Sequence, residues 1–270
     1  MELHGKRVLI TGASRGIGRC LASTFAEAGA KVALVARTAD ALGSLAAELG
    51  GTAHPADLSD PAVVAGLIGR VEDDAGPVDV LVNNAGVGVI GSFLHLTDDD
   101  ARWIFQVNAL APISLARQVV PRMLERGGGA IVNVSSLAGV ATFPGLSLYA
   151  STKAALSQFT AGLRADLRGL PVRTTLVELG PIPTDMLDEV KHYRPTELSF
   201  RRGGRLQLLP NIPAEKVAAE VVAAVVSGRR HVRLPRRMVP MAGLTEAPRR
   251  ITEILLTGVP HQADTTSRTR

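Results

Sequence analysis

The sequence predicts an α/β fold in which one parallel sheet of about seven strands is covered by helices on both faces, a doubly wound arrangement. Apolar runs such as Lys31–Ala36 and Val172–Leu179 are continuous rather than alternating, which is typical of strands buried on both faces. Helical patterns separate these runs, and strands that alternate with helices favour a parallel sheet. No linker or repeat interrupts the pattern, so we expect one domain over residues 1–270.

The first strand, helix and second strand predict a dinucleotide site. Lys6–Thr11 has the pattern of a short buried strand, the glycine-rich loop Gly12–Gly18 follows, and a helical pattern covers Arg19–Ala28 before the strand Lys31–Ala36. Such a loop lets the backbone approach a pyrophosphate, whose charge faces the free N–H groups of the helix. The spacing is G-x-x-x-G-x-G rather than G-x-G-x-x-G, and a tight turn alone is the alternative interpretation.

The same alternation continues along the rest of the chain. The patterns predict helices over Ala39–Leu49 and Pro61–Asp74 and strands over Val78–Val82, Ala130–Ser135 and Val172–Leu179, with Val232 and Leu234 in the last strand. In a doubly wound sheet, ligands bind beyond the carboxyl ends of the strands. We therefore expect the functional residues where these strands end.

Tyr149 and Lys153 are candidate catalytic residues because side chains four apart share one face of a helix. A free phenol has a pKa of ~10 and is a poor acid or base at neutral pH. A fixed cation beside it favours the phenolate and lowers that pKa, which makes the tyrosine a useful proton donor and acceptor. The pair alone also occurs by chance on many helices. Ser136, thirteen residues before Tyr149, and the dinucleotide unit favour the catalytic interpretation.

Taken together, the motifs resemble the short-chain dehydrogenase/reductase family, in its branch of single-domain oxidoreductases with a Rossmann-type fold. In the family's order, from about residue 5 to residue 186, they are Thr11-Gly-Ala-Ser-Arg-Gly-Ile-Gly18, Asn83-Asn-Ala-Gly86, Asn108, Ser136 and Tyr149-x-x-x-Lys153. The resemblance implies hydride transfer between a nicotinamide cofactor and a small carbonyl or secondary alcohol. A nonenzymatic NADP(H)-sensing or scaffold protein on the same fold is the alternative.

The resemblance also implies roles for the catalytic residues. Tyr149 would be the general acid in reduction and the general base in oxidation, and Lys153 would lower its pKa and bind the nicotinamide ribose. Ser136 would hold the substrate oxygen, with its neighbour Ser135 as the rival. Asn108, at a helix distortion, would hold a water that links Lys153 to solvent. The alternative for Asn108 is a buried amide that satisfies backbone groups.

The cofactor site follows from the same resemblance. Asp57 would bind the adenine amino group, although Asp57-Leu-Ser-Asp-Pro61 also has the pattern of a turn or helix entry. Ile182 and Thr184 would contact the nicotinamide carboxamide. The expected cofactor residues are Gly12, Ser14, Arg15, Gly16, Ile17, Gly18, Arg37, Asp57, Leu58, Asn84, Ala85, Gly86, Tyr149, Lys153, Ile182 and Thr184.

Charge at the end of the second strand predicts a preference for NADP(H) over NAD(H). NAD-binding proteins usually place a carboxylate there, on the ribose 2′-hydroxyl. This chain has Ala36-Arg37-Thr38 and no acid until Asp40, and it carries Arg15 inside the glycine loop. Two guanidinium groups suit a 2′-phosphate. The alternative is that Arg37 only stacks on adenine.

The substrate end is the least regular part of the sequence. Leu179 replaces the family's usual proline before Gly180, which puts the local turn in doubt, and residues 187–212 are expected to form a substrate lid. This lid is rich in arginine and could attract an anionic substrate or the acidic surface of a carrier, or it could be an ordinary solvated loop. We expect the substrate that binds at this end to be a mainly apolar molecule.

The C-terminal part carries the excess of positive charge. Residues 187–270 contain 15 Lys and Arg against 8 Asp and Glu, and we expect residues 235–270 to form a basic C-terminal extension. Its apolar residues could cover the substrate pocket or a subunit interface, and peripheral membrane contact is a second possibility. With few aromatic residues and no recognition module, nucleic-acid binding is not expected.

Other features limit the cellular and chemical context. A single cysteine, Cys20, excludes an intrachain disulfide, and the six histidines lack metal-ligand spacing, so no metal is expected. The chain enters its first strand without a signal sequence, and Val217–Val226 is too short to span a bilayer, so we expect a cytoplasmic protein. The resemblance implies a homotetramer or homodimer that associates through helices over Asp98–Arg126 and Ser151–Leu170.

Overall fold

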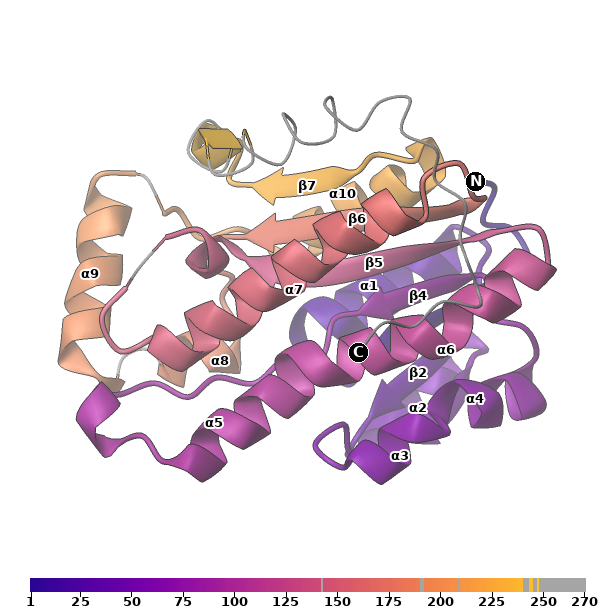
Figure 1. The fold of residues 1–270 in the computed structure, drawn as a ribbon, viewed down its shortest axis with the longest axis horizontal. Coiled ribbons are helices and arrows are strands. Elements are labelled where there is room, and N and C mark those ends of the chain that lie inside the picture. Colours follow the sequence, from indigo (N-terminus) through magenta and orange to yellow (C-terminus); the bar gives the residue numbers. More distant parts are fainter. Residues whose placement is uncertain (142, 190–191, 208, 240–242, 245–246, 248–270) are drawn as a thin grey trace, which may run out of the picture.

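A seven-stranded parallel sheet forms the centre of the molecule, with the strand order β3-β2-β1-β4-β5-β6-β7 (Figure 1). The computed structural model describes residues 1–270 except 142, 190–191, 208, 240–242, 245–246 and 248–270. The strands are β1 (Arg7–Thr11), β2 (Lys31–Ala36), β3 (Thr52–Pro55), β4 (Val80–Asn83), β5 (Gly129–Ser136), β6 (Val172–Leu179) and β7 (His231–Leu234). The order reverses between β1 and β4, which are neighbours in the sheet. The predicted doubly wound fold is confirmed.

Helices cover both faces of this sheet. One face packs against α1 (Gly16–Glu27), α2 (Ala39–Leu49) and α10 (Ala214–Ser227). The other packs against α3 (Pro61–Ala65), α4 (Leu67–Ala75), α6 (Ala111–Glu125) and α7 (Ser147–Asp166). The remaining elements are η1 (Phe93–His95), α5 (Asp98–Phe105), the π-helical turn η2 (Gln106–Leu110), η3 (Leu137–Gly139), α8 (Asp185–Glu189), α9 (Arg194–Arg205) and η5 (Arg236–Met238).

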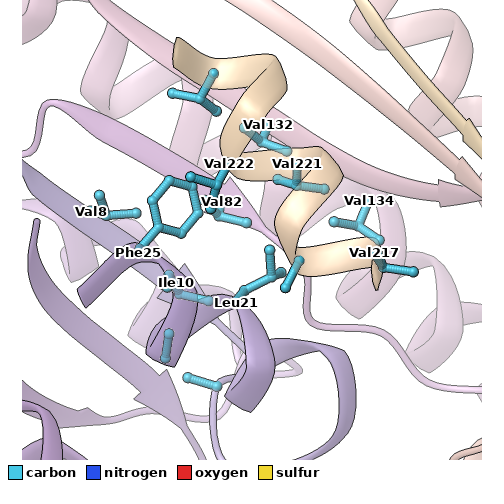
Figure 2. Packing of buried hydrophobic residues seen from close by; sticks show 14 of the residues in the cluster. Val8, Ile10, Leu21, Phe25, Val82, Val132, Val134, Val217, Val221 and Val222 are labelled. Atoms are coloured by element: carbon cyan, nitrogen blue, oxygen red, sulfur yellow. The ribbon is translucent and has the colours of Figure 1, made fainter. Parts of the chain in front are cut away.

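Alternation along the strands divides the buried residues between the two faces. In β1, Val8 and Ile10 face α1 and α10, whereas Leu9 faces the opposite layer. Figure 2 shows the first layer, where Leu21 and Phe25 of α1 meet valines of α10 over the sheet. Continuous apolar strands are needed here because successive residues enter different cores.

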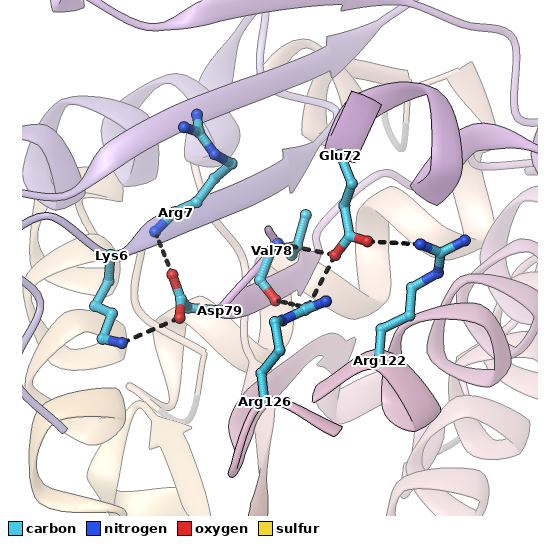
Figure 3. A network of polar contacts seen from close by, with 7 residues as sticks. All are labelled: Lys6, Arg7, Glu72, Val78, Asp79, Arg122 and Arg126. Atoms are coloured by element: carbon cyan, nitrogen blue, oxygen red, sulfur yellow. Dashed lines mark hydrogen bonds and ion pairs between the residues drawn. The ribbon is translucent and has the colours of Figure 1, made fainter. Parts of the chain in front are cut away.

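Carboxylates fix the amino ends of β1 and β4, away from the ends where ligands bind (Figure 3). Glu72 accepts hydrogen bonds from Arg122 and Arg126, both at 2.9 Å, and from the backbone N–H of Val78 at 3.0 Å. Asp79 accepts from the backbone N–H of Arg7 at 2.8 Å. The bond to Glu72 occupies the N–H of Val78, and β4 begins at Val80 rather than at Val78 as expected.

Two expected helices are interrupted in the structure, the second of them at the distortion expected around Asn108. The helix expected over Pro61–Asp74 is divided at Gly66, whose φ of −109° and ψ of 6° are not helical. The helix expected over Asp98–Arg126 contains the π-helical turn η2 between α5 and α6. Most of the expected C-terminal extension lies outside the described residues. No helix in the described part of the chain is long and apolar enough to cross a membrane.

Candidate active site

A cavity of about 840 Å³ lies at the carboxyl ends of the strands. It is bounded by the loop after β1, the turn after β4, the end of β5, the first turns of α7 and the segment after β6. Of the predicted site residues, all but Asn108 line this cavity. They are Gly12, Ser14, Arg15, Gly16, Ile17, Gly18, Arg37, Asp57, Leu58, Asn84, Ala85, Gly86, Ser136, Tyr149, Lys153, Ile182 and Thr184. The fold therefore gathers residues that are up to 172 positions apart in the sequence, from Gly12 to Thr184.

The glycine loop packs against its neighbours so closely that side chains could not stand there. Gly12 and Gly16 have φ values of +66° and +53°, a region that L-residues rarely adopt. A β-carbon on Gly12 would lie 2.8 Å from the Cα of Ala85, and one on Gly18 would overlap the carbonyl oxygen of Gly12. The loop can thus turn tightly and bring the amino end of α1 to the cavity, as a pyrophosphate site requires.

The turn after β4 holds this loop in place. Asn84 donates from its side chain to the carbonyl oxygens of Thr11 at 2.9 Å and Gly12 at 3.2 Å. In return, the hydroxyl of Thr11 accepts the backbone N–H groups of Asn84 and Ala85, both at 3.1 Å. These reciprocal bonds link the ends of β1 and β4 and hold the glycine loop against this turn.

Tyr149 and Lys153 lie one turn apart on α7, with the lysine Nζ 5.7 Å from the centre of the phenol ring. Lys153 is buried, and its Nζ donates to the carbonyl oxygen of Val134 at 3.0 Å. Burial lowers the pKa of Lys153 to about 8. The ammonium is thus positioned within the cavity wall and loses its proton as the pH rises through about 8.

The pKa of Tyr149 differs from the expectation. Burial raises the pKa of the phenol, and a hydrogen bond from Ser136 opposes that rise. The expected lowering by Lys153 is not found, because the lysine binds Val134 and lies over the ring rather than against the phenol oxygen. Ser136 therefore also lowers the pKa of Tyr149, an effect that sequence reasoning missed.

The choice between Ser135 and Ser136 follows from their bonds. Ser135 is buried, donates to the backbone carbonyl of Lys153 at 2.9 Å and shares a 2.8 Å hydrogen bond with Ser157. Ser136 is only partly buried and bonds to Tyr149. Its hydroxyl also accepts the N–H of Ala138 at 3.1 Å. Ser135 positions α7, and Ser136 is the serine placed for chemistry.

Asn108 lies in the π-helical turn η2, so the expected helix distortion is confirmed. Its side chain is fully buried, accepts the N–H of Val87 at 2.8 Å and donates to the carbonyl of Val87 at 2.9 Å. It also donates to the hydroxyl of Thr152 at 3.1 Å. The side chain therefore does what the alternative interpretation described: it satisfies backbone groups, and it ties the loop after Gly86 to α7.

A small space nevertheless remains between Asn108 and Lys153. A β-carbon on Gly86 would lie 3.3 Å from the Nζ of Lys153 and 3.5 Å from the Oδ1 of Asn108. Glycine at this position keeps the space beside the lysine open.

The end of the cavity near the glycine loop is lined by Asp57, Arg15 and Arg37. The carboxylate of Asp57 accepts the N–H of Ser59 at 2.9 Å and its hydroxyl at 2.8 Å, and these bonds lower the pKa of Asp57. Asp60, not Asp57, caps α3. Asp57 is thus a turn residue that also lines the cavity. Arg15 and Arg37 are exposed at the same end.

Apolar side chains of the predicted lid, residues 187–212, and of the loops beside it line the opposite end. The rings of Phe143 and Phe200 lie 5.1 Å apart, and Thr196 donates to the carbonyl of Pro144 at 2.6 Å, which fixes α9 over the cavity. Ile90, Phe143, Leu146, Leu187, Phe200 and Leu209 line this end. Sequence reasoning did not single out Ile90, Phe143, Leu146 or Leu209 because they lie in or beside loops without a periodic pattern.

Although Leu179 replaces the family's usual proline, strand β6 stays regular up to its last residue. Leu179 is the last residue of β6 and pairs with Leu234 of β7, and the N–H of Gly180 donates to the carbonyl of Leu234 at 2.7 Å. The preceding residue, Glu178, forms a 2.6 Å ion pair with Arg233, and both side chains are almost fully buried. The strand pairing therefore continues to the edge of the cavity.

These features are typical of dinucleotide-binding oxidoreductases: a glycine-rich turn at the switch point of a doubly wound sheet faces a tyrosine, a lysine and a serine across one cavity. A family model described as short chain dehydrogenase matches residues 6–195. The chain belongs to this family.

Relatives and solved structures agree with that assignment. The chain is 38% identical over 192 residues to a short chain dehydrogenase of Pseudocercospora fijiensis. The match covers 68% of this chain and 62% of the relative, so the chain spans less than two thirds of that relative's length. A short chain dehydrogenase/reductase of Burkholderia phymatum in complex with NAD has a TM-score of 0.78 at 26% identity, covering 99% of this chain and 100% of that one. A metagenomic short-chain oxidoreductase in complex with NADP has a TM-score of 0.70 at 29% identity, covering 87% and 98%.

Among the described residues, no three His, Cys, Asp or Glu side chains are grouped so that they could hold a metal ion.

Proposed function

We propose that the protein is an NADP(H)-dependent oxidoreductase that interconverts a carbonyl and a secondary alcohol on a mainly apolar molecule. The observation that carries the proposal is the position of Ser136, Tyr149 and Lys153 between two unlike ends of one cavity. One end has the glycine loop and two arginines, and the other is lined by the apolar side chains of the lid. A hydride donor and an apolar acceptor could meet between them.

The residues present fit a nicotinamide dinucleotide. Gly12 and Gly18 let the loop pack tightly and bring the amino end of α1 to the cavity, where a pyrophosphate could bind, and the space at Gly86 lies beside Lys153. Ile182 and Thr184 line the cavity on its side after β6. When bound, the cofactor supplies or accepts the hydride.

The chain's own residues would manage the proton and the charge of the substrate oxygen. Tyr149 would donate its phenolic proton to that oxygen in reduction and take it back in oxidation. Ser136 has one hydroxyl proton, which points to the carbonyl oxygen of Leu179 at 3.3 Å, and it would turn that proton to donate a hydrogen bond to the substrate oxygen. Lys153, whose Nζ lies 5.7 Å from the centre of the phenol ring, would contribute a positive charge over the face of the ring when the phenolate remains. Asn108 would contribute by fixing Val87 and α7 around this group and, as the resemblance implies, through a water beside Lys153.

The preference for NADP(H) rests on the end of β2. Arg37 follows this strand directly, Arg15 precedes α1, and both line the cavity where they could bind a 2′-phosphate. Solved relatives bind NADP in one case and NAD in another, so the family alone does not choose. A dissociation constant for NAD⁺ equal to or below that for NADP⁺ would contradict this part of the proposal.

The decisive experiment measures NADPH oxidation by the purified protein across a panel of apolar ketones and acyl thioesters. Turnover that follows cofactor oxidation with equimolar alcohol formation would support the reductase. Tight NADPH binding without turnover, also in the oxidative direction with secondary alcohols, would instead favour the nonenzymatic sensor.

The assembly and location also remain proposals. We infer a homodimer or homotetramer in the cytoplasm, associating through α5, α6 and α7, as the resemblance implies. Mass measurement by light scattering tests the oligomeric state, and a monomer at micromolar concentration would contradict it.

A further inference from the structure

The outer face of the lid helix α9 carries a stripe of positive charge. Arg194, Leu198, Arg201 and Arg205 are spaced four, three and four residues apart, so they share one face of the helix, and all four are exposed. The opposite face holds Thr196, which bonds to Pro144, and Phe200, which stacks near Phe143. The stripe therefore points away from the cavity, and a small substrate bound inside could not reach it.

The arginines of this stripe differ from most other exposed arginines of the molecule. Arg19 pairs with Glu48 at 3.3 Å, Arg122 with Glu72 at 2.9 Å and Arg229 with Glu220 at 3.0 Å. Within the described ranges, no ion pair forms at Arg194, Arg201, Arg205 or their neighbour Arg202. The one carboxylate of α9, Glu197, cannot balance four charges. An anionic partner would supply the missing charge.

Exposed apolar side chains lie beside this stripe. Phe93 and Leu94 of η1 are 70% and 88% exposed. The N–H of Gly91, just before η1, donates to the carbonyl of Gly145, and the start of α9 packs on the same turn of the chain. Figure 1 shows η1, in the loop that leads to α5, and α9 at the same end of the molecule. Leu198 and Leu206 of the lid are also exposed.

We propose that this edge, formed by η1 and the outer face of α9, docks on an anionic lipid surface. The guanidinium groups would bind lipid phosphates, and Phe93 and Leu94 would enter the boundary between headgroups and acyl chains. Adjacent large apolar side chains beside unpaired arginines are the combination that such an interface binds. An acidic protein would match the stripe alone and leave Phe93 and Leu94 in water.

Docking in this way would place the apolar end of the cavity next to the bilayer. Phe200 lines the cavity from the inner face of the same helix whose outer face carries the stripe. A substrate dissolved in lipid could then enter without crossing water, and this consequence rests on the proposed function. The docking itself does not depend on the reaction.

The test is co-sedimentation of the full-length protein with vesicles of phosphatidylcholine alone and of phosphatidylcholine with phosphatidylglycerol. We expect binding to the anionic vesicles only, weakened by added salt. The double variant Arg201→Gln/Arg205→Gln should bind about 25-fold more weakly, about fivefold per arginine. Phe93→Ser/Leu94→Ser should weaken binding roughly tenfold or more. The matched control Arg19→Gln/Arg70→Gln removes two exposed charges from α1 and α4 and should change binding less than about twofold.

Two results would overturn the proposal. One is absence of wild-type binding to anionic vesicles, and the other is an equal loss in the control variant. If the α9 variant instead changes the mass of the protein in light scattering without changing vesicle binding, the edge is a contact between copies of this chain. Circular dichroism verifies that each variant is folded. Turnover of a water-soluble ketone without vesicles is measured separately, so failure of docking and failure of the reductase are distinguished.

Discussion

The two ends of the cavity are built in different ways. The cofactor end consists of strand termini joined by reciprocal hydrogen bonds, such as those between Thr11 and Asn84, above a continuous core. The lid consists of α8, α9 and their connections, and Thr196 is the one buried residue within α9. One end is fixed by the sheet, whereas the other is held by a few contacts to the turn at Pro144 and Gly145.

This difference indicates how the tasks are divided. Catalytic groups need positions fixed to a fraction of an ångström, and the sheet with α7 provides them. A pocket that admits an apolar molecule needs a wall that can open, and segments with few buried contacts open at a lower free-energy cost. We therefore expect substitutions at the cofactor end to affect chemistry or stability strongly, and substitutions on the outer face of the lid to affect neither.

The largest effect is expected from Tyr149→Phe. Loss of the phenolic proton should lower turnover by about 10² to 10⁴-fold, the usual contribution of a general acid. NADPH affinity, measured by fluorescence titration, should remain near that of the wild type. The chain's other tyrosine offers a control, since Tyr193→Phe removes a hydroxyl from the lid and should retain most of the activity. More than a tenth of wild-type turnover in Tyr149→Phe would reject the assigned role.

Stability should show the same contrast between the two ends. Leu21 is fully buried between α1, the sheet and α10, and Leu21→Ala should lower the free energy of unfolding by about 2–5 kcal/mol. Leu198 on α9 is 40% exposed, and Leu198→Ala should change it by less than about 0.5 kcal/mol. Urea unfolding followed by circular dichroism measures both. Equal losses would mean that the lid is as firmly integrated as the core.

What the sequence predicts well is the part governed by periodicity and short motifs. The buried strands, the glycine loop and the Tyr149–Lys153 pair depend on local patterns, and the fold then brings them to one cavity. The break at Gly66 and the start of β4 at Val80 were missed because each depends on one local contact or dihedral angle. The pKa of Tyr149 was predicted in the wrong direction because burial and the bond from Ser136 arise only from the tertiary structure.

Lys153 should make both activity and stability depend on pH near 8. Its pKa is lowered from 10.5 to about 8, so the ammonium form, which the proposed mechanism needs, decreases as pH rises through about 8. Turnover should fall there. Between about 8 and 10.5 the unfolded chain keeps a proton that the folded protein has lost, so this residue makes the free energy of unfolding rise with pH. Lys153→Met should remove that contribution, and pH-dependent urea unfolding of both proteins would detect it. An unchanged slope would show that the lysine is not desolvated.

A smaller effect is expected from Gly86→Ala, which tests the open space beside the lysine. Its new methyl group would stand 3.3 Å from the Nζ of Lys153, closer than such groups usually approach, and in ordinary contact with the Oδ1 of Asn108 at 3.5 Å. Turnover should fall roughly tenfold, as a small displacement of a catalytic group can cause. The free energy of unfolding should change by about 1–3 kcal/mol at most, as for other overpacked sites. Gly91→Ala is the matched control, since a β-carbon there meets nothing within 4 Å, in the same loop but toward the lid. If both variants behave alike, the space beside Lys153 has no part in catalysis; if only Gly86→Ala loses turnover, the strict geometry of the cofactor end extends as far as this glycine and stops before the lid.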